Sequence, residues 1–155
     1  MNLKSSITLF SHHVIIPLII GSMLYISYRS LSLRMFSWFE AIGLSNFIKS
    51  IREIINPYKE SLPNWIYFSM PDALWVYSFT SAILLIWNNK IVKAKYWLLI
   101  PFISGCLVEI AQGLKLVEGT FDPIDLILCS LSFILSMIII NSISVKHENN
   151  THQNY

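Results

Sequence analysis

Charged side chains are scarce in this chain. Asp, Glu, Lys and Arg make up 13% of its 155 residues, whereas hydrophobic residues make up 54%. Soluble domains typically have about 25% charged and about 45–50% apolar residues. Because the apolar excess is concentrated in runs long enough to cross a bilayer, the composition excludes an ordinary soluble domain and indicates an integral membrane protein whose first partner is the lipid bilayer.

Strong net charge and cysteine patterns are also missing. The net charge is only +2, and no basic cluster is interleaved with aromatic residues, which argues against a nucleic-acid-binding protein. The two cysteines, Cys106 and Cys129, both lie in apolar segments and are interpreted as small buried hydrophobic residues rather than a disulfide. No Cys/His spacing typical of a metal site occurs, so the sequence predicts no metal ligands and specifies no cofactor.

Four apolar segments are predicted to cross the membrane. The second is short for a crossing of about 20 residues, so it either gains length from Tyr67 to Pro71 or lies in a thinned part of the bilayer. The first is interpreted as a retained anchor, because no small-x-small cleavage site follows its apolar core. The four segments run from about Ile7 to Tyr28, Asp72 to Trp87, Tyr96 to Leu116 and Pro123 to Val145.

A segment of another kind lies between the first two spans. From Ser45 to Ile55, apolar residues repeat at helical spacing opposite a polar face. Beside membrane spans, this pattern predicts an amphipathic helix in the plane of the interface; packing on a soluble partner is the alternative. The predicted fold is therefore all-α, a polytopic bundle of four transmembrane helices plus one interfacial amphipathic helix. Its parts are an N-terminal anchor (1–29), an interfacial segment (30–70), a three-helix core (71–146) and a polar tail (147–155).

The short connection between the second and third spans predicts the orientation of the chain. It contains three lysines, Lys90, Lys93 and Lys95. Loops rich in Lys and Arg favour the cytoplasmic side, and four spans place both termini on the side of this loop. Both termini are therefore predicted to be cytoplasmic.

The carboxylates of the spans are predicted to gather on the opposite side. Antiparallel threading brings together the start of the second span, the end of the third and the start of the fourth. These places hold Asp72, then Glu109 with Gln112, then Asp122 with Asp125. A carboxylate at bilayer depth is costly and is tolerated mainly where it faces protein, water or a ligand. Asp72, Glu109 and Asp125 are therefore expected to converge, with Gln112 beside them, and to share a proton or recruit a cation.

Most of these acids also have a local explanation. Asp122 before Pro123 is a good N-cap, Asp125 three residues on would complete a capping box, and the helix dipole favours Asp72. Glu109 lies near a helix C-terminus, where the dipole disfavours a negative charge, so no local rule explains it. A protonated glutamate that is hydrogen-bonded inside the bundle is the structural alternative.

Small and polar residues form one stripe on each of the last two spans. Such stripes mark faces where helices approach closely, so the two are expected to face one another. The stripes comprise Pro101, Gly105, Glu109, Gln112 and Gly113 on the third span, and Asp125, Cys129, Ser132 and Ser136 on the fourth.

The motif Glu109-x-x-Gln112, followed by Phe121-Asp122-x-x-Asp125 at the start of the last helix, resembles the VanZ-like family of small bacterial membrane proteins. Asp72 stands where that family has an acidic residue opening an earlier helix. The resemblance covers about Leu62 to Ile140.

Three departures separate the chain from the family pattern. The arginine that usually precedes the Phe-Asp element is replaced by Glu118-Gly-Thr120. Cys129 and Phe133 stand where the family commonly has Asn and Gly, and Trp75 stands in place of a histidine. An activity that needs the arginine or the histidine is in doubt.

The resemblance implies a multi-pass inner-membrane protein of the bacterial cell envelope, in a family whose founding member is associated with glycopeptide resistance. The leading hypothesis is an acidic site on the outer face that binds a polar or cationic ligand: a lipid-linked cell-wall precursor, a glycopeptide antibiotic or a metal ion. One alternative is a membrane enzyme acting on a lipid-linked substrate, with Glu109 or Asp125 as general base or metal ligand. Another is an accessory subunit of a larger membrane complex. The candidate ligand-binding residues are Asp72, Glu109, Gln112, Asp122 and Asp125.

Overall fold

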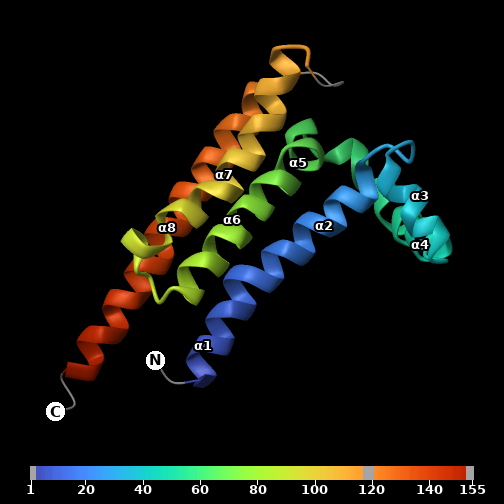
Figure 1. Cartoon of the computed structure of the whole chain (residues 1–155). Helices are drawn as coiled ribbons and strands as arrows, with labels where there is room; N and C mark the ends of the chain where they lie inside the picture. The colour runs from blue at the N-terminus through green and yellow to red at the C-terminus, as the bar shows by residue number, and fades with distance from the viewer. Residues whose placement is uncertain (1–2, 117–120, 153–155) are drawn as a thin grey trace.

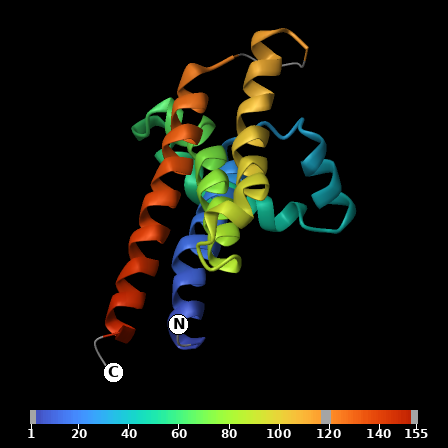
Figure 2. The same ribbon diagram turned by 60° about the vertical axis from the view of Figure 1, so that its left-hand side comes forward.

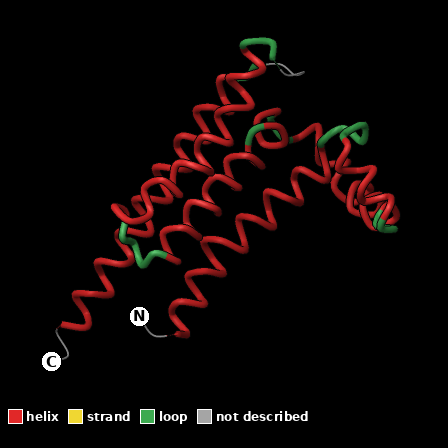
Figure 3. The backbone as a smooth tube through the Cα atoms, in the orientation of Figure 1, coloured by secondary structure: helices red, strands yellow, loops and turns green. Residues whose placement is uncertain are grey.

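The computed structural model describes the backbone of residues 3–116 and 121–152, and the side chains of residues 5–116 and 121–144. Every element in these ranges is helical (Figures 1 and 3), which confirms the all-α prediction. In chain order the elements are α1 (Leu3–Phe10), the π-helical turn η1 (Ser11–Ile15), α2 (Ile16–Tyr28), α3 (Arg34–Ala41), α4 (Ser45–Ile55), the 3-10 helix η2 (Asn56–Ser61), α5 (Asn64–Phe68), α6 (Met70–Ile86), α7 (Ile91–Gly113) and α8 (Pro123–His152).

Three of the described segments are long and apolar enough to cross a membrane: Ser5–Tyr28, Ile91–Gly113 and Pro123–Ser144. The predicted second span corresponds to α6, which is apolar but has only 17 residues. At about 1.5 Å per residue it is roughly 25 Å long, less than a hydrocarbon core of about 30 Å. The short helix α5 precedes α6 with only Ser69 between them. The chain therefore has the helices of a multi-pass membrane protein, with three full-length spans and one shorter helix where four spans were predicted.

The first span is a continuous rod made of α1, η1 and α2 (Figure 1). The π-helical turn η1 ends two residues before Pro17, which has no N–H to donate to the preceding turn. The Ser78 hydroxyl of α6 donates a hydrogen bond of 2.8 Å to the carbonyl of Val14 in this turn. The irregular turn is thereby fixed against α6.

Helix α6 occupies the centre of the bundle, between α2 and the α7–α8 pair (Figures 1 and 2). Two glycines allow its close contacts. A Cβ on Gly21 of α2 would lie 3.1 Å from the indole of Trp75, and one on Gly105 of α7 would lie 3.0 Å from Val76. The predicted stripes on α7 and α8 do meet where Gly105 faces Cys129, but α8 packs more extensively on α6 than on α7.

The threading of the chain is the predicted antiparallel one. The described ends of α1 and α8 and the α6–α7 connection lie at one end of the bundle (Figure 1). The end of α2, the start of α6, the end of α7 and the start of α8 lie at the other, which we call the upper end. Which end faces the cytoplasm stays a prediction from the lysines of the α6–α7 connection.

The ends of two helices differ from the ends of the predicted membrane spans. Helix α7 begins at Ile91 rather than Tyr96, because the fully buried Ala94 packs in the bundle although Lys93 and Lys95 flank it. It ends at Gly113, before Lys115 takes a φ of 57°. Helix α8 continues to His152, so the backbone of the predicted polar tail is helical up to that residue. Hydropathy located the apolar part of each helix, whereas hydrogen bonding extends into the polar flanks.

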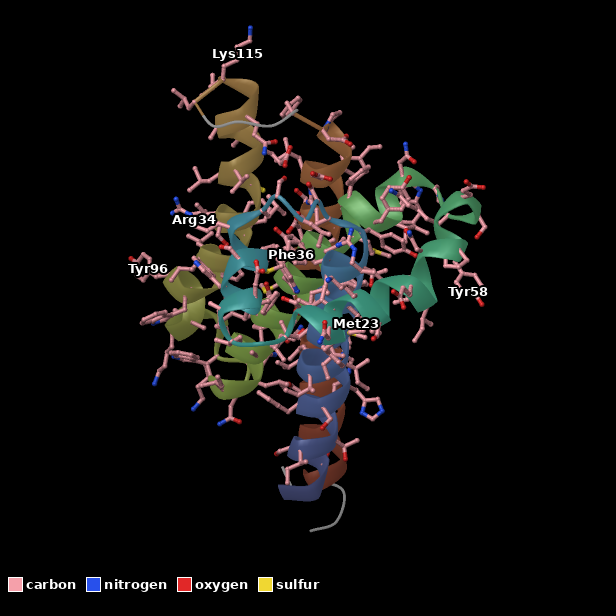
Figure 4. The ribbon with its side chains drawn as sticks, turned by 90° about the vertical axis from the view of Figure 1, so that its right-hand side faces the viewer. Met23, Arg34, Phe36, Tyr58, Tyr96 and Lys115 are labelled. Atoms are coloured by element: carbon pink, nitrogen blue, oxygen red, sulfur yellow. The ribbon has the colours of Figure 1, made fainter. Side chains whose placement is uncertain are left out.

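The predicted amphipathic helix is present as α4, with the predicted bounds. Together with α3 it forms a hairpin that runs across the axis of the bundle at the upper end (Figure 4). Ile48 and Ile51 are buried, and Arg52 donates hydrogen bonds of 2.9 Å to the carbonyls of Ile26 and Arg29. These are free carbonyls at the C-terminus of α2, so Arg52 caps that helix and anchors the hairpin to it.

Candidate functional site

Three carboxylates from three helices line one cavity at the upper end of the bundle. Asp72 lies in the first turn of α6, Glu109 near the end of α7 and Asp125 in the first turn of α8. The cavity has a volume of about 90 Å³, and Ser104, Gly105, Val108 and Cys129 complete its lining. The structure thus places together the three acids that threading was expected to bring together.

Glu109 joins α7 to the start of α8. Its side chain is only 7% exposed, and its Oε2 accepts a hydrogen bond of 3.1 Å from the backbone N–H of Asp122. It also lines the same cavity as Asp125. The dipole of α7 disfavours a carboxylate near its C-terminus, where Glu109 lies. The N-terminus of α8, which Glu109 contacts, favours a carboxylate and so explains its position.

Asp122 is the N-cap of α8, as predicted. Its Oδ1 accepts a hydrogen bond of 2.9 Å from the N–H of Ile124, and the helix begins at Pro123. The capping box predicted with Asp125 was wrong, because the Asp122 N–H donates to Glu109 instead. Asp122 does not line the cavity, so its evident role is structural.

Asp125 is the least satisfied of the three acids. Its side chain is 8% exposed, and its buried Oδ1 has no hydrogen-bond partner among the described residues. A buried polar atom without a partner is costly, and native proteins retain few of them. This oxygen is therefore the acceptor that the cavity offers to an incoming group.

Asp72 has a basic partner that the sequence analysis did not identify. Arg29, at the end of α2, makes a salt bridge of 3.3 Å with Asp72 and donates to the carbonyl of Phe68 at 3.0 Å. Its guanidinium also lies 5.3 Å from the ring centre of Tyr25. The sequence could have indicated this pair, because the predicted threading puts the end of the first span, where Arg29 lies, in the same layer as the acids.

Gln112 is not brought into the site. It is half-buried and lies outside the lining of the cavity. Its backbone carbonyl accepts the backbone N–H of Lys115 in the turn that ends α7. Gly105 and Cys129, predicted only as packing residues, line the cavity instead.

The chemistry of the cavity is that of hydrogen-bond acceptors. Within residues 5–116 and 121–144, no group of three or more His, Cys, Asp or Glu side chains is placed to hold a metal ion. Asp72 is paired with Arg29 and Glu109 accepts a backbone N–H, which leaves the oxygen of Asp125. The arrangement suits a group that donates hydrogen bonds or carries positive charge.

Comparison with known protein families, with curated proteins and with solved structures finds no match for this chain. Fold and site therefore define a class rather than a family. The chain is an all-helical protein with the helices of a multi-pass membrane protein, and it has a carboxylate-lined cavity at one end of its bundle.

Proposed function

We propose that this chain is a VanZ-like protein of the bacterial inner membrane, and that its acid cavity binds a protonated amine of a cell-envelope ligand at the outer membrane face. The observation that carries the proposal is the unpartnered Oδ1 of Asp125, buried in a cavity that it shares with Glu109 and Asp72. Both termini are then cytoplasmic, and the upper end of the bundle faces outward.

The charge balance favours a cationic group over a neutral one. Arg29 compensates Asp72, but no described basic side chain forms a salt bridge with Glu109 or Asp125. Two neighbouring carboxyl groups in a poorly solvated site either share a proton or take up a cation. An ammonium group has three donors, enough for the Asp125 oxygen and its neighbours.

The size of the cavity restricts what enters it. About 90 Å³ corresponds to roughly three water molecules at about 30 Å³ each, so one functional group fits while the rest of a larger ligand stays outside. Of the candidate ligands, an amine-bearing, lipid-linked cell-wall precursor suits this best, because it diffuses in the membrane and presents its head group at the surface. A metal ion is less suited, since the described side chains offer no set of three ligands.

The family assignment is supported by the positions of the motif acids. Asp72, Glu109 and Asp125 come from separate parts of the sequence, and all three line the same cavity. The arginine of the family pattern is absent before the Phe-Asp element, but Arg29 contributes a guanidinium to this layer from α2.

The test is ligand binding by the purified full chain in nanodiscs, measured by native mass spectrometry. The probe is a lipid-linked cell-wall precursor with a free amine, compared with the same molecule acetylated on that amine. We expect the free amine to bind and Asp125→Asn to lower its affinity at least about tenfold, as expected when a charge-assisted hydrogen bond is lost. Glu53→Gln, on the exposed face of α4, is the matched control. Equal binding of the acetylated probe, or unchanged binding to Asp125→Asn, would refute the proposal.

A membrane enzyme is the second candidate, favoured by the proximity of Glu109 and Asp125. Two carboxyl groups that line one cavity are suited to general acid–base chemistry on a bound substrate. The same incubation distinguishes the two functions, because an enzyme changes the mass of the precursor over time and a binding protein does not.

A further inference from the structure

A second cavity, separate from the acid site, opens between α3 and α4. It has a volume of about 490 Å³, and all its lining residues belong to α3, α4 and the connection before α3. Its lining combines two cations, Arg34 and Lys49, with one carboxylate, Glu40, three serine hydroxyls and apolar side chains that include Phe36 and Ile48. We call it the hairpin groove.

The groove carries a surplus of positive charge. Its two cations outnumber the single carboxylate, and neither Arg34 nor Lys49 makes an ion pair within the described part of the chain. Both side chains are exposed, whereas Phe36 and Ile48 of the same lining are buried (Figure 4 labels Arg34 and Phe36). The groove therefore has a cationic rim above an apolar floor.

The groove lies beside the end of a segment that is long and apolar enough to cross a membrane. It adjoins the end of the span Ser5–Tyr28, and α4 runs across the bundle axis there (Figure 4). The same hairpin exposes large apolar side chains that the acyl region of a bilayer would cover favourably, namely Trp38, Ile42, Phe47 and Ile54.

We propose that the hairpin groove binds the phosphate of an anionic phospholipid, with the acyl chains lying along the exposed apolar side chains of α3 and α4. Arg34 matches the phosphate oxygens with two parallel N–H donors, Lys49 adds a point charge, and the Ser45 hydroxyl supplies a further donor. Glu40 is placed to accept a hydrogen bond from a head-group hydroxyl, and the net positive charge of the groove favours an anionic head group over a zwitterionic one. This site is independent of the acid cavity and of the function proposed for it.

The experiment titrates the purified full chain in detergent with phosphatidylglycerol and counts retained lipids by native mass spectrometry. The test variant is Arg34→Gln with Lys49→Gln. The matched control is Lys59→Gln with Lys115→Gln, which removes the same charge from the same end of the bundle but outside the groove. Thermal unfolding in detergent checks that both variants fold.

We expect one phosphatidylglycerol to be retained with a preference over phosphatidylcholine. The test variant should bind it at least about tenfold more weakly, as expected when charge-assisted hydrogen bonds to the phosphate are lost, and the control should be unchanged. Equal losses in both double variants would overturn the proposal in favour of general surface attraction. Displacement of the lipid by an equal concentration of glycerol 3-phosphate would overturn the lipid assignment in favour of free phosphate.

Discussion

The carboxylate of Glu109 accepts the backbone N–H of Asp122 at 3.1 Å, although 13 residues separate the two in the sequence. In a capping box, a side chain of the same helix accepts the N–H of the N-cap residue. Here the acceptor comes from the preceding helix, so one hydrogen bond both caps α8 and holds it against the end of α7. Glu109 thus has a structural role as well as a place in the cavity.

Substitutions of Glu109 should separate these two roles. Glu109→Gln keeps a carbonyl oxygen that can accept the Asp122 N–H, so the stability should change little while amine binding is lost. Glu109→Ala leaves that N–H without its partner and should lower the free energy of unfolding by about 1–3 kcal/mol. Thermal unfolding in detergent and the nanodisc binding assay measure the two effects. Equal destabilisation by Gln and Ala would contradict the capping role.

The salt bridge between Arg29 and Asp72 should appear as a coupling energy. Both side chains are about one-third exposed, at 28% and 32%, so we expect a coupling of about 1 kcal/mol or less between Arg29→Gln and Asp72→Asn. The double variant should be more stable than the sum of the single effects predicts, because neither charge is left alone. A double-mutant cycle of unfolding in detergent measures this, and strict additivity would show that the two groups do not interact.

The contact between α2 and α6 should be sensitive to any side chain at position 21. A Cβ there would lie 3.1 Å from both the carbonyl oxygen of Pro71 and the indole of Trp75. Gly21→Ala should therefore destabilise the bundle by about 1–3 kcal/mol, since the helices must separate. Gly113→Ala is the control, because its Cβ would meet only the side chain of Phe121, at 3.3 Å. An equal or larger loss for the control would contradict the packing argument, because Ala is the better helix former at both positions.

Reporter fusions test the threading. Fusions after residues 30, 60 and 118 should report the outer side, and fusions after 92 and 150 the cytoplasmic side, because α6 crosses between the two groups. The fusions are informative because α6 is shorter than a full-length span, so its crossing of the membrane has to be tested. If the fusions after 60 and 118 report opposite sides, α6 does not cross the membrane and the bundle is inserted differently.

The α3–α4 hairpin should lie in the membrane interface by its apolar edge. Phe47 and Ile54 are 60% and 70% exposed, whereas Lys49 and Glu53 share the opposite face. Spin labels at Phe47→Cys and Ile54→Cys should be more accessible to oxygen than to a water-soluble nickel chelate, with the reverse at Lys49→Cys and Glu53→Cys. The native cysteines are first removed by the substitutions Cys106→Ser and Cys129→Ala. Identical accessibility at all four positions would exclude the interfacial placement.

The sequence by itself determined where the helices lie and where the acids gather. The pattern of apolar residues located three long spans, the shorter α6 and the amphipathic α4, because burial in lipid and helical hydrogen bonding both depend on residues near in sequence. Alternating helix direction then placed Asp72, Glu109 and Asp125 at one end, which needs no knowledge of how the helices rotate.

Only the tertiary structure decided which groups are partners. Whether Asp72 finds Arg29, whether Glu109 or Asp125 accepts the Asp122 N–H, and whether Gln112 reaches the cavity all depend on rotations and separations of a few ångströms between helices. Those are fixed by packing of distant residues, such as Gly21 against Trp75 and Gly105 against Val76. The hydropathy of a segment cannot predict such contacts, because it is an average over many residues, whereas a hydrogen bond depends on the positions of two atoms.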